Sequence, residues 1–150
     1  MSETLKTMFL AIDTMFKNAQ IDYALLKKQK IDMHFFDDYN QTRIVNSFLF
    51  NFGKLQDKIG AKLFKQVFYD MKEIDSFSLS MLDILNLLEK YEILQNIEQW
   101  DKLREIRNIL SHEYPFDIQE RIENIDLALE GFNELKHIYD NLKNYTKSIS

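Results

Sequence analysis

The 150-residue chain contains no cysteine, one proline and three glycines. Without cysteine there is no disulfide framework, no thiolate metal site and no cysteine nucleophile, and a reducing compartment is compatible with the chain. An architecture of many tight turns needs glycine and proline at its corners, so their scarcity argues against a β-rich fold. The sequence therefore predicts helices.

Long hydrophobic runs are also missing. The longest stretch without a charge, residues 44–53, has ten residues, about half of the ~20 that a transmembrane helix needs. The opening residues Met-Ser-Glu-Thr-Leu-Lys lack the basic patch and apolar run of a secretory signal. We expect a cytoplasmic protein with no membrane partner.

The charge balance excludes one class of nucleic-acid binder. The chain has 19 Lys plus Arg against 24 Asp plus Glu, a formal net charge of -5. Non-specific coating of nucleic acid depends on neutralising many phosphates, so this sign opposes it. Any nucleic-acid role requires a local site. The 45% hydrophobic and 29% charged residues are typical of a globular chain, and we expect one domain over residues 1–150.

Apolar residues recur at helical spacing along most of the chain. The periodic stretches are residues 5–26, 44–71, 79–91, 97–110 and 118–145. Residues 31–42 are aromatic, acidic and aperiodic, so we interpret them as a connection whose aromatic side chains cap the bundle or meet a partner. The pattern predicts an all-α fold, a four- to five-helix up-and-down bundle.

Several residues mark the expected helix ends. Candidate N-caps of the third helix are Asp75, Ser76 and Ser78, and its inward residues are expected to be Leu79, Leu82, Leu85, Leu88 and Tyr91. Pro115 ends the fourth helix, and Asp117 with Glu120 forms a capping box that opens the last one.

Two of the three glycines, Gly53 and Gly60, lie seven residues apart within the second helix. They share one face, because seven residues are about two helical turns. The simplest interpretation is that they let a neighbouring helix approach closely, since glycine in a helix costs ~1 kcal/mol of propensity.

Most catalytic constellations are absent from the sequence. It has no phosphate-binding glycine loop, no histidine pair at metal-ligand spacing and no strand-turn-helix context for a nucleophilic serine. His34 is interpreted as a connection residue, and His137 is expected on the exposed side of the last helix. No metal and no cofactor are therefore expected.

The segment 100–115 is the exception, because polar residues interrupt its apolar face. At about 100° per residue, Arg107 falls between Trp100 and Leu103. A guanidinium in that position keeps its charge and needs an anionic or carbonyl partner. Beside it runs a polar edge of Ser111, Arg104, Asn108 and His112. Arginine suits planar, bidentate recognition of phosphate better than lysine does.

The geometry of Arg107 and His112 leaves three arrangements open. On one ideal helix the two side chains project about 140° apart and ~7.5 Å along the axis, so they do not meet at one atom. Either the chain turns after Ser111 and swings His112 back, or two copies of the helix meet across a two-fold axis. Alternatively, Arg107 pairs with a carboxylate of a neighbouring helix and His112 caps helix carbonyls.

The run from Arg107 to Tyr114 resembles the R-x-x-x-x-H-x-Y signature of the HEPN superfamily, in particular the HepT-like toxins that are paired with minimal nucleotidyltransferase antitoxins. The resemblance covers residues 44–116. It extends to residues 55–60 with Leu63-Phe64, to residues 87–90, and to Trp100 with Leu103 and Arg104. One departure is Tyr91-Glu92, where a Leu-Gly-like helix end is expected.

The resemblance implies a homodimeric, metal-independent endoribonuclease with a composite cleft at the subunit interface. In that family pattern Arg107 holds the scissile phosphate, and His112 acts as general base or general acid. Asn108 orients His112 or the phosphate, and Asp57 supports the site from the second helix. Tyr114 is the hydroxyl to which the antitoxin enzyme attaches adenylate.

Two alternative functions stay open at this point. One is a non-catalytic subunit that presents a helical dimer surface to a separate nucleotidyltransferase, formerly read as its substrate-binding subunit. The other is a structural bundle without a partner. Cleavage of RNA by the purified protein without divalent metal distinguishes the enzyme from both.

Overall fold

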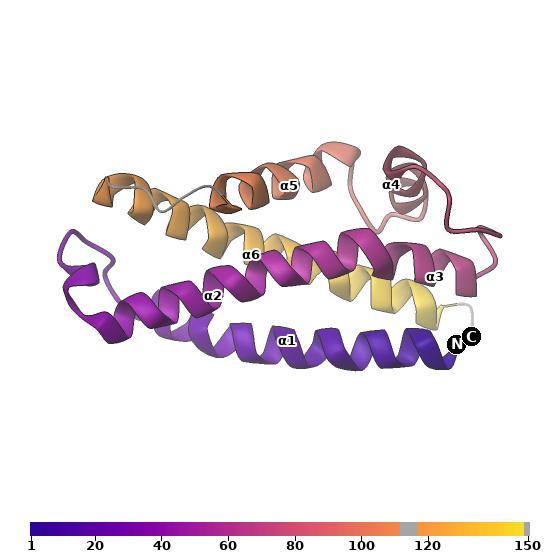
Figure 1. Ribbon diagram of the computed structural model, residues 1–150. Helices are drawn as coiled ribbons and strands as arrows, with labels where there is room; N and C mark the ends of the chain where they lie inside the picture. Colours follow the sequence, from indigo (N-terminus) through magenta and orange to yellow (C-terminus); the bar gives the residue numbers. More distant parts are fainter. Residues whose placement is uncertain (112–116, 149–150) are drawn as a thin grey trace.

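The computed structural model describes residues 1–111 and 117–148, and every regular element in these ranges is helical (Figure 1). The elements are α1 (Glu3–Lys27), η1 (Phe35–Asp37), α2 (Tyr39–Lys58), η2 (Ile59–Leu63), α3 (Phe64–Asp70), α4 (Met81–Lys90), α5 (Ile97–Ser111) and α6 (Ile118–Lys147). The predicted all-α bundle is confirmed.

The long helices α1, α2, α5 and α6 lie side by side, and successive ones run in opposite directions (Figure 1). Helix α6 runs antiparallel to α1: Asn133 Nδ2 donates to Tyr23 Oη at 2.8 Å, and Tyr139 Oη donates to Asp13 Oδ1 at 2.7 Å. The short helix α4 lies at the end of the bundle beside α3 (Figure 1). The start of α1 and the end of α6 are at that same end (Figure 1).

One continuous helical rod is formed by α2, η2 and α3. Its N-cap is Asp38, whose carboxylate accepts a hydrogen bond from the Asn40 N–H at 2.9 Å. The rod therefore begins at Tyr39, and the prediction that residues 39–42 belong to the connection is wrong, because the cap favours helix from that point. The single long helix expected over residues 44–71 is present to Asp70, interrupted by the π-helical segment η2.

Helix α4 begins later than expected. Its N-cap is Ser80, whose Oγ accepts from the Asp83 N–H at 3.2 Å, whereas Ser76 and Ser78 hydrogen-bond each other at 2.7 Å. The prediction of an N-cap at residues 75–78 is therefore wrong. So is the inward position of Leu82, which is 59% exposed. The buried side of α4 consists of Ile84, Leu85 and Leu88, and Leu82 lies outside it.

The starts of the last two helices agree with the sequence. Helix α5 begins at Ile97, and the Asp117 carboxylate caps α6 by accepting from the Gln119 N–H at 2.9 Å. Pro115 lies outside the described residues. In the described ranges no helix is long and apolar enough to cross a membrane.

Aromatic rings form the centre of the core. Phe132 of α6 packs against Phe16 and Tyr23 of α1 and Phe48 of α2, with ring centroids 5.2 to 5.8 Å apart. Contacts of this kind add to the burial of large apolar surfaces and fix the mutual position of α1, α2 and α6. Helix α5 then packs on the α2–α6 layer, and this packing positions the polar edge predicted from the sequence.

Candidate functional site

Two glycines of the rod set the distance between α2 and α5. A Cβ atom built on Gly53 would lie 3.0 Å from Nε of Arg107, and one built on Gly60 would lie 2.7 Å from Cζ2 of Trp100. Arg107 and Trp100 are seven residues apart on α5, as the glycines are on the rod, so the two helices meet in antiparallel register. The predicted close approach at these glycines is confirmed.

Arg107 lies across Gly53 and reaches the edge of α2. Its Nη2 is 3.2 Å from Oδ2 of Asp57, and the two side chains are 31% and 54% exposed. The guanidinium therefore has the anionic partner that its position on the helix requires. Of the arrangements left open by the sequence, a pair with a carboxylate of a neighbouring helix is the one that the structure shows for Arg107.

The ion pair with Asp57 is made through Nη2 of the Arg107 guanidinium. Nε of Arg107 is buried and has no hydrogen-bond partner within the described residues. A buried donor without a hydrogen bond costs about 1–3 kcal/mol of stability. The position of Arg107 against Gly53 is therefore not explained by its hydrogen bonds alone. The ion pair is half-exposed, and pairs of this kind contribute only ~0–1 kcal/mol to stability.

The other predicted residues of α5 lie along its exposed edge. Arg104 makes an ion pair within its own helix, with Nη2 3.4 Å from Oδ1 of Asp101. Ser111 Oγ donates to the carbonyl oxygen of Asn108 at 2.8 Å, and both residues are exposed. His112 and Tyr114 lie outside the described residues. The structure thus brings Arg107 and Asp57 together and leaves Arg104, Asn108 and Ser111 beside them at the surface.

Gln56 is a polar residue of this interface that the sequence analysis missed. It is 4% exposed, and its Oε1 has no hydrogen-bond partner in the described part of the chain. Its spacing of three residues from Gly53 and four from Gly60 places it on the side of α2 that faces α5. The sequence signal for this burial is the helical spacing of Gln56 from the two glycines, since the other buried residues of α2 are apolar or glycine.

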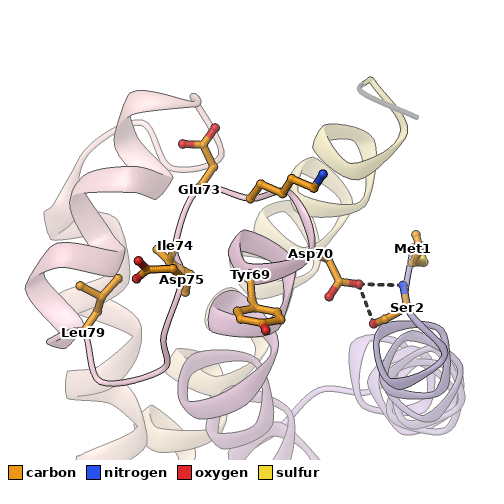
Figure 2. A pocket seen from close by; sticks show the side chains of 9 residues that line it. Met1, Ser2, Tyr69, Asp70, Glu73, Ile74, Asp75 and Leu79 are labelled. Atoms are coloured by element: carbon orange, nitrogen blue, oxygen red, sulfur yellow. Dashed lines mark hydrogen bonds between the residues drawn. The ribbon is translucent and has the colours of Figure 1, made fainter.

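An open depression of about 780 Å³ lies away from Arg107, at the end of α3. It is lined by Tyr69, Asp70, Glu73 and Asp75 together with Ser2 (Figure 2). Burial alone would raise the pKa of Asp70, but hydrogen bonds from the Ser2 hydroxyl (2.6 Å) and N–H (2.8 Å) and from Gln66 lower it below its usual value. This carboxylate joins α3 to the start of α1.

A smaller cavity of about 250 Å³ lies between α5 and α6, on the other side of α5. Its floor is Leu103 and Ile106, and Glu130 and Glu134 stand at its rim. Carboxylates repel phosphate, so an anionic ligand is disfavoured there and favoured on the side of Arg107. In residues 1–111 and 117–148, no group of three or more histidines and carboxylates could hold a metal ion.

Histidines outside the motif occupy surface positions. His34 is exposed, with Nδ1 3.2 Å from Asp37 Oδ2, and His137 is exposed on α6 as expected.

Comparison of the chain with protein-family models, with curated proteins and with solved structures gives no match. The features that bear on function are therefore the geometry around Arg107 and the motif that contains it.

Proposed function

We propose that the protein is a metal-independent endoribonuclease toxin of the HEPN type, held in check by a minimal nucleotidyltransferase. The observation that carries the proposal is the setting of Arg107. A permanently charged, planar donor is fixed over a glycine by Asp57, at a surface edge that also bears Asn108 and Ser111. Fixed donors aimed at a developing anionic charge are the largest single contribution in many enzymes.

In this proposal Arg107 holds the scissile phosphate through the N–H groups that Asp57 does not use. His112 takes the proton of the ribose 2′-hydroxyl or gives one to the 5′ leaving oxygen, a role that suits an unperturbed pKa of ~6.5. Asn108 orients the phosphate or His112. Two copies of the chain supply the Arg and His sets of one cleft across a two-fold axis, because one α5 does not aim both side chains at one atom.

Tyr114 gives the proposal its regulatory part. Adenylation by the nucleotidyltransferase would join the Tyr114 oxygen to the α-phosphate of ATP, with loss of the hydroxyl proton and release of pyrophosphate. The attached phosphate and base would then fill the place of the RNA. Intact-mass measurement after coexpression with a cognate nucleotidyltransferase tests this step. The adenylate increment should appear on the wild type and be absent from Tyr114→Phe, which keeps the ring and lacks the acceptor oxygen.

Cleavage of RNA in EDTA by the purified protein is the test of the nuclease. His112→Ala and Arg107→Ala should abolish cleavage, and Arg107→Lys should stay far below the wild type because a lysine lacks the planar fork. His137→Ala, an exposed histidine on α6, is the matched control and should cleave normally. Light scattering should give about twice the 18.0 kDa chain mass. Full activity of His112→Ala, or a need for added metal, contradicts the proposal.

The ion pair also favours a second candidate function. Because Asp57 already neutralises Arg107, the same surface suits a non-catalytic subunit that binds a nucleotidyltransferase. In that case the purified protein does not cleave RNA but forms a stable complex with the nucleotidyltransferase. The EDTA assay and a complex-formation assay on the same preparation separate the two functions.

A further inference from the structure

The rod formed by α2, η2 and α3 is locally basic in an acidic protein. The rod, residues 39–70, has two carboxylates, Asp57 and Asp70, against five cations: Arg43, Lys54, Lys58, Lys62 and Lys65. Asp57 is paired with Arg107, and Asp70 accepts hydrogen bonds from Ser2. This stretch is therefore the place where a chain of net charge -5 can attract an anion.

Basic and aromatic side chains alternate on the outward side of α2. Taken at about 100° per residue, Tyr39, Arg43, Phe50 and Lys54 fall within a band about 60° wide. We call these four residues the α2 strip. All are exposed, Tyr39 by 74% and Phe50 by 64%, and Nζ of Lys54 is 5.6 Å from the centroid of the Phe50 ring. The buried side of the same helix carries Val45, Phe48, Phe52 and Leu55.

Within residues 1–111 and 117–148, no other helix buries the side chains of the strip. The long helices that contact α2 include α1, α5 and α6, and in Figure 1 the rod passes in front of α6 between α1 and α5. Asp57 lies three residues beyond Lys54, on the α5 side of the strip, and holds Arg107 there. The strip thus ends at the candidate site.

We infer that the α2 strip binds single-stranded RNA and leads it to Arg107, an inference that depends on the proposed nuclease function. Arg43 and Lys54 are eleven residues apart, about 16 Å along the helix, so they pair with phosphates of different, non-adjacent nucleotides of one strand. The exposed rings of Tyr39 and Phe50 beside them provide faces on which unpaired bases stack. In a duplex the base faces are covered, so Tyr39 and Phe50 select a single strand. An acidic protein surface would pair its carboxylates with Arg43 and Lys54, and the two rings would then add apolar contact area instead of stacking on bases.

The test is binding of a short, fluorescently labelled 2′-O-methyl oligoribonucleotide, followed by fluorescence anisotropy. This probe has no free 2′-hydroxyl, so it is bound without being cut and the measurement does not depend on catalysis. The double variant Tyr39→Ala/Phe50→Ala should raise the Kd about tenfold or more, since each stacked base is worth roughly a five- to hundredfold change. The double variant Arg43→Gln/Lys54→Gln should weaken binding and reduce the salt slope by about 1.4, at ~0.7 per cation.

Matched controls are available on α1 and at its C-cap, Lys28. Lys17→Gln/Lys28→Gln removes two exposed cations, and Leu10→Ala/Leu25→Ala removes two exposed apolar side chains. Both should bind within about twofold of the wild type, as expected for surface changes outside the footprint. Circular dichroism of all variants should show the same helix content, because none of the changed residues is buried.

Three results overturn the inference. One is a wild type that does not bind the probe, and another is strip variants that bind as the controls do. The third is loss of binding in the Arg43/Lys54 variant alone, which would make the strip a general anion surface suited to an acidic protein. Cleavage of ordinary RNA in EDTA tests the nuclease function separately. If the wild type cleaves RNA but the strip variants bind the probe normally, the protein is a nuclease that binds its substrate outside the α2 strip.

Discussion

Trp100 and Gly60 are in direct contact where α5 packs on the rod of α2, η2 and α3: a Cβ atom on Gly60 would lie 2.7 Å from Cζ2 of the indole. Trp100 is 2% exposed and packs edge-on against Phe64, with ring centroids 4.9 Å apart. The ring therefore cannot move aside cheaply. Gly60 also lies in the π-helical segment η2, whose wider turn occurs where the indole meets the rod.

Gly60→Ala should destabilise the protein by about 1–3 kcal/mol through overpacking, although alanine has the better helix propensity by ~1 kcal/mol. The free energy of unfolding from urea denaturation, followed by circular dichroism, measures the change. Ser47→Ala, an exposed substitution in α2, is the control and should leave stability unchanged or slightly raised. A Gly60→Ala variant as stable as the wild type would show that the indole is free to shift.

The fold could be predicted from the sequence because its apolar periodicity is strong and its breaks are few. Errors occur where a local signal has more than one reading. Four polar residues before α4 are all plausible caps, and tertiary packing selects Ser80. Leu82 fits the apolar pattern, yet Ile84 fits it better and defines the buried face. Such choices depend on contacts with distant residues, which a periodic pattern does not contain.

The candidate site could be predicted in part. The position of Arg107 on its helix implied an anionic partner, and Asp57 was named from the resemblance; the structure shows the two together at 3.2 Å. The burial of Gln56 was not foreseen, because a glutamine in a helix is usually exposed. The roles of His112 and Tyr114 stay predictions from the motif.

Glu92 stands where the resemblance suggested a glycine, and its backbone has the left-handed conformation, with φ of 60°. The N–H of Ile93 donates to the Leu88 carbonyl at 2.9 Å, so α4 ends in the arrangement that favours glycine after the cap. Glu92→Gly should raise the free energy of unfolding by up to about 1 kcal/mol, because the strain of a Cβ in this conformation is removed.

Glu105→Gly provides the matched control for that substitution. Glu105 is exposed within α5, where the same change should destabilise by about 1 kcal/mol through lost helix propensity. Urea denaturation of both variants gives the comparison. If Glu92→Gly is as destabilising as Glu105→Gly, the left-handed conformation at residue 92 carries no strain.

The link between Asp70 and Ser2 predicts a loss of stability in acid. The pKa of Asp70 is lowered in the folded state from its usual 3.8, so its hydrogen bonds stabilise the fold fully above pH 3.8. This contribution is lost as the pH falls through the lowered pKa. Asp70→Asn should therefore be less stable than the wild type near neutral pH, and the difference should shrink as the pH falls below 3.8.

Urea denaturation at a series of pH values measures this difference. Asp75→Asn, at an exposed carboxylate that lines the same depression, is the control and should follow the wild type at each pH (Figure 2). An Asp70→Asn variant whose deficit is constant across the acid range would show that the hydrogen bonds to Ser2 do not depend on ionisation.

Gly53→Ala tests whether the position of Arg107 matters apart from its charge. The new Cβ would lie 3.0 Å from Nε and 3.1 Å from Cζ of Arg107, so the guanidinium must shift by a few tenths of an ångström. Since it ends a flexible, 31% exposed side chain, the shift is cheap. The gain in helix propensity of ~1 kcal/mol offsets the cost of this shift, and stability should change little.

Under the proposed function, however, RNA cleavage by Gly53→Ala should fall by about tenfold or more, because misplacement of a catalytic donor by as little as ~1 Å can cost a hundredfold in rate. Parallel measurement of the urea midpoint and of kcat in EDTA separates the two effects. Wild-type kcat in a stable Gly53→Ala protein would mean that Arg107 does not contact the scissile phosphate from this position.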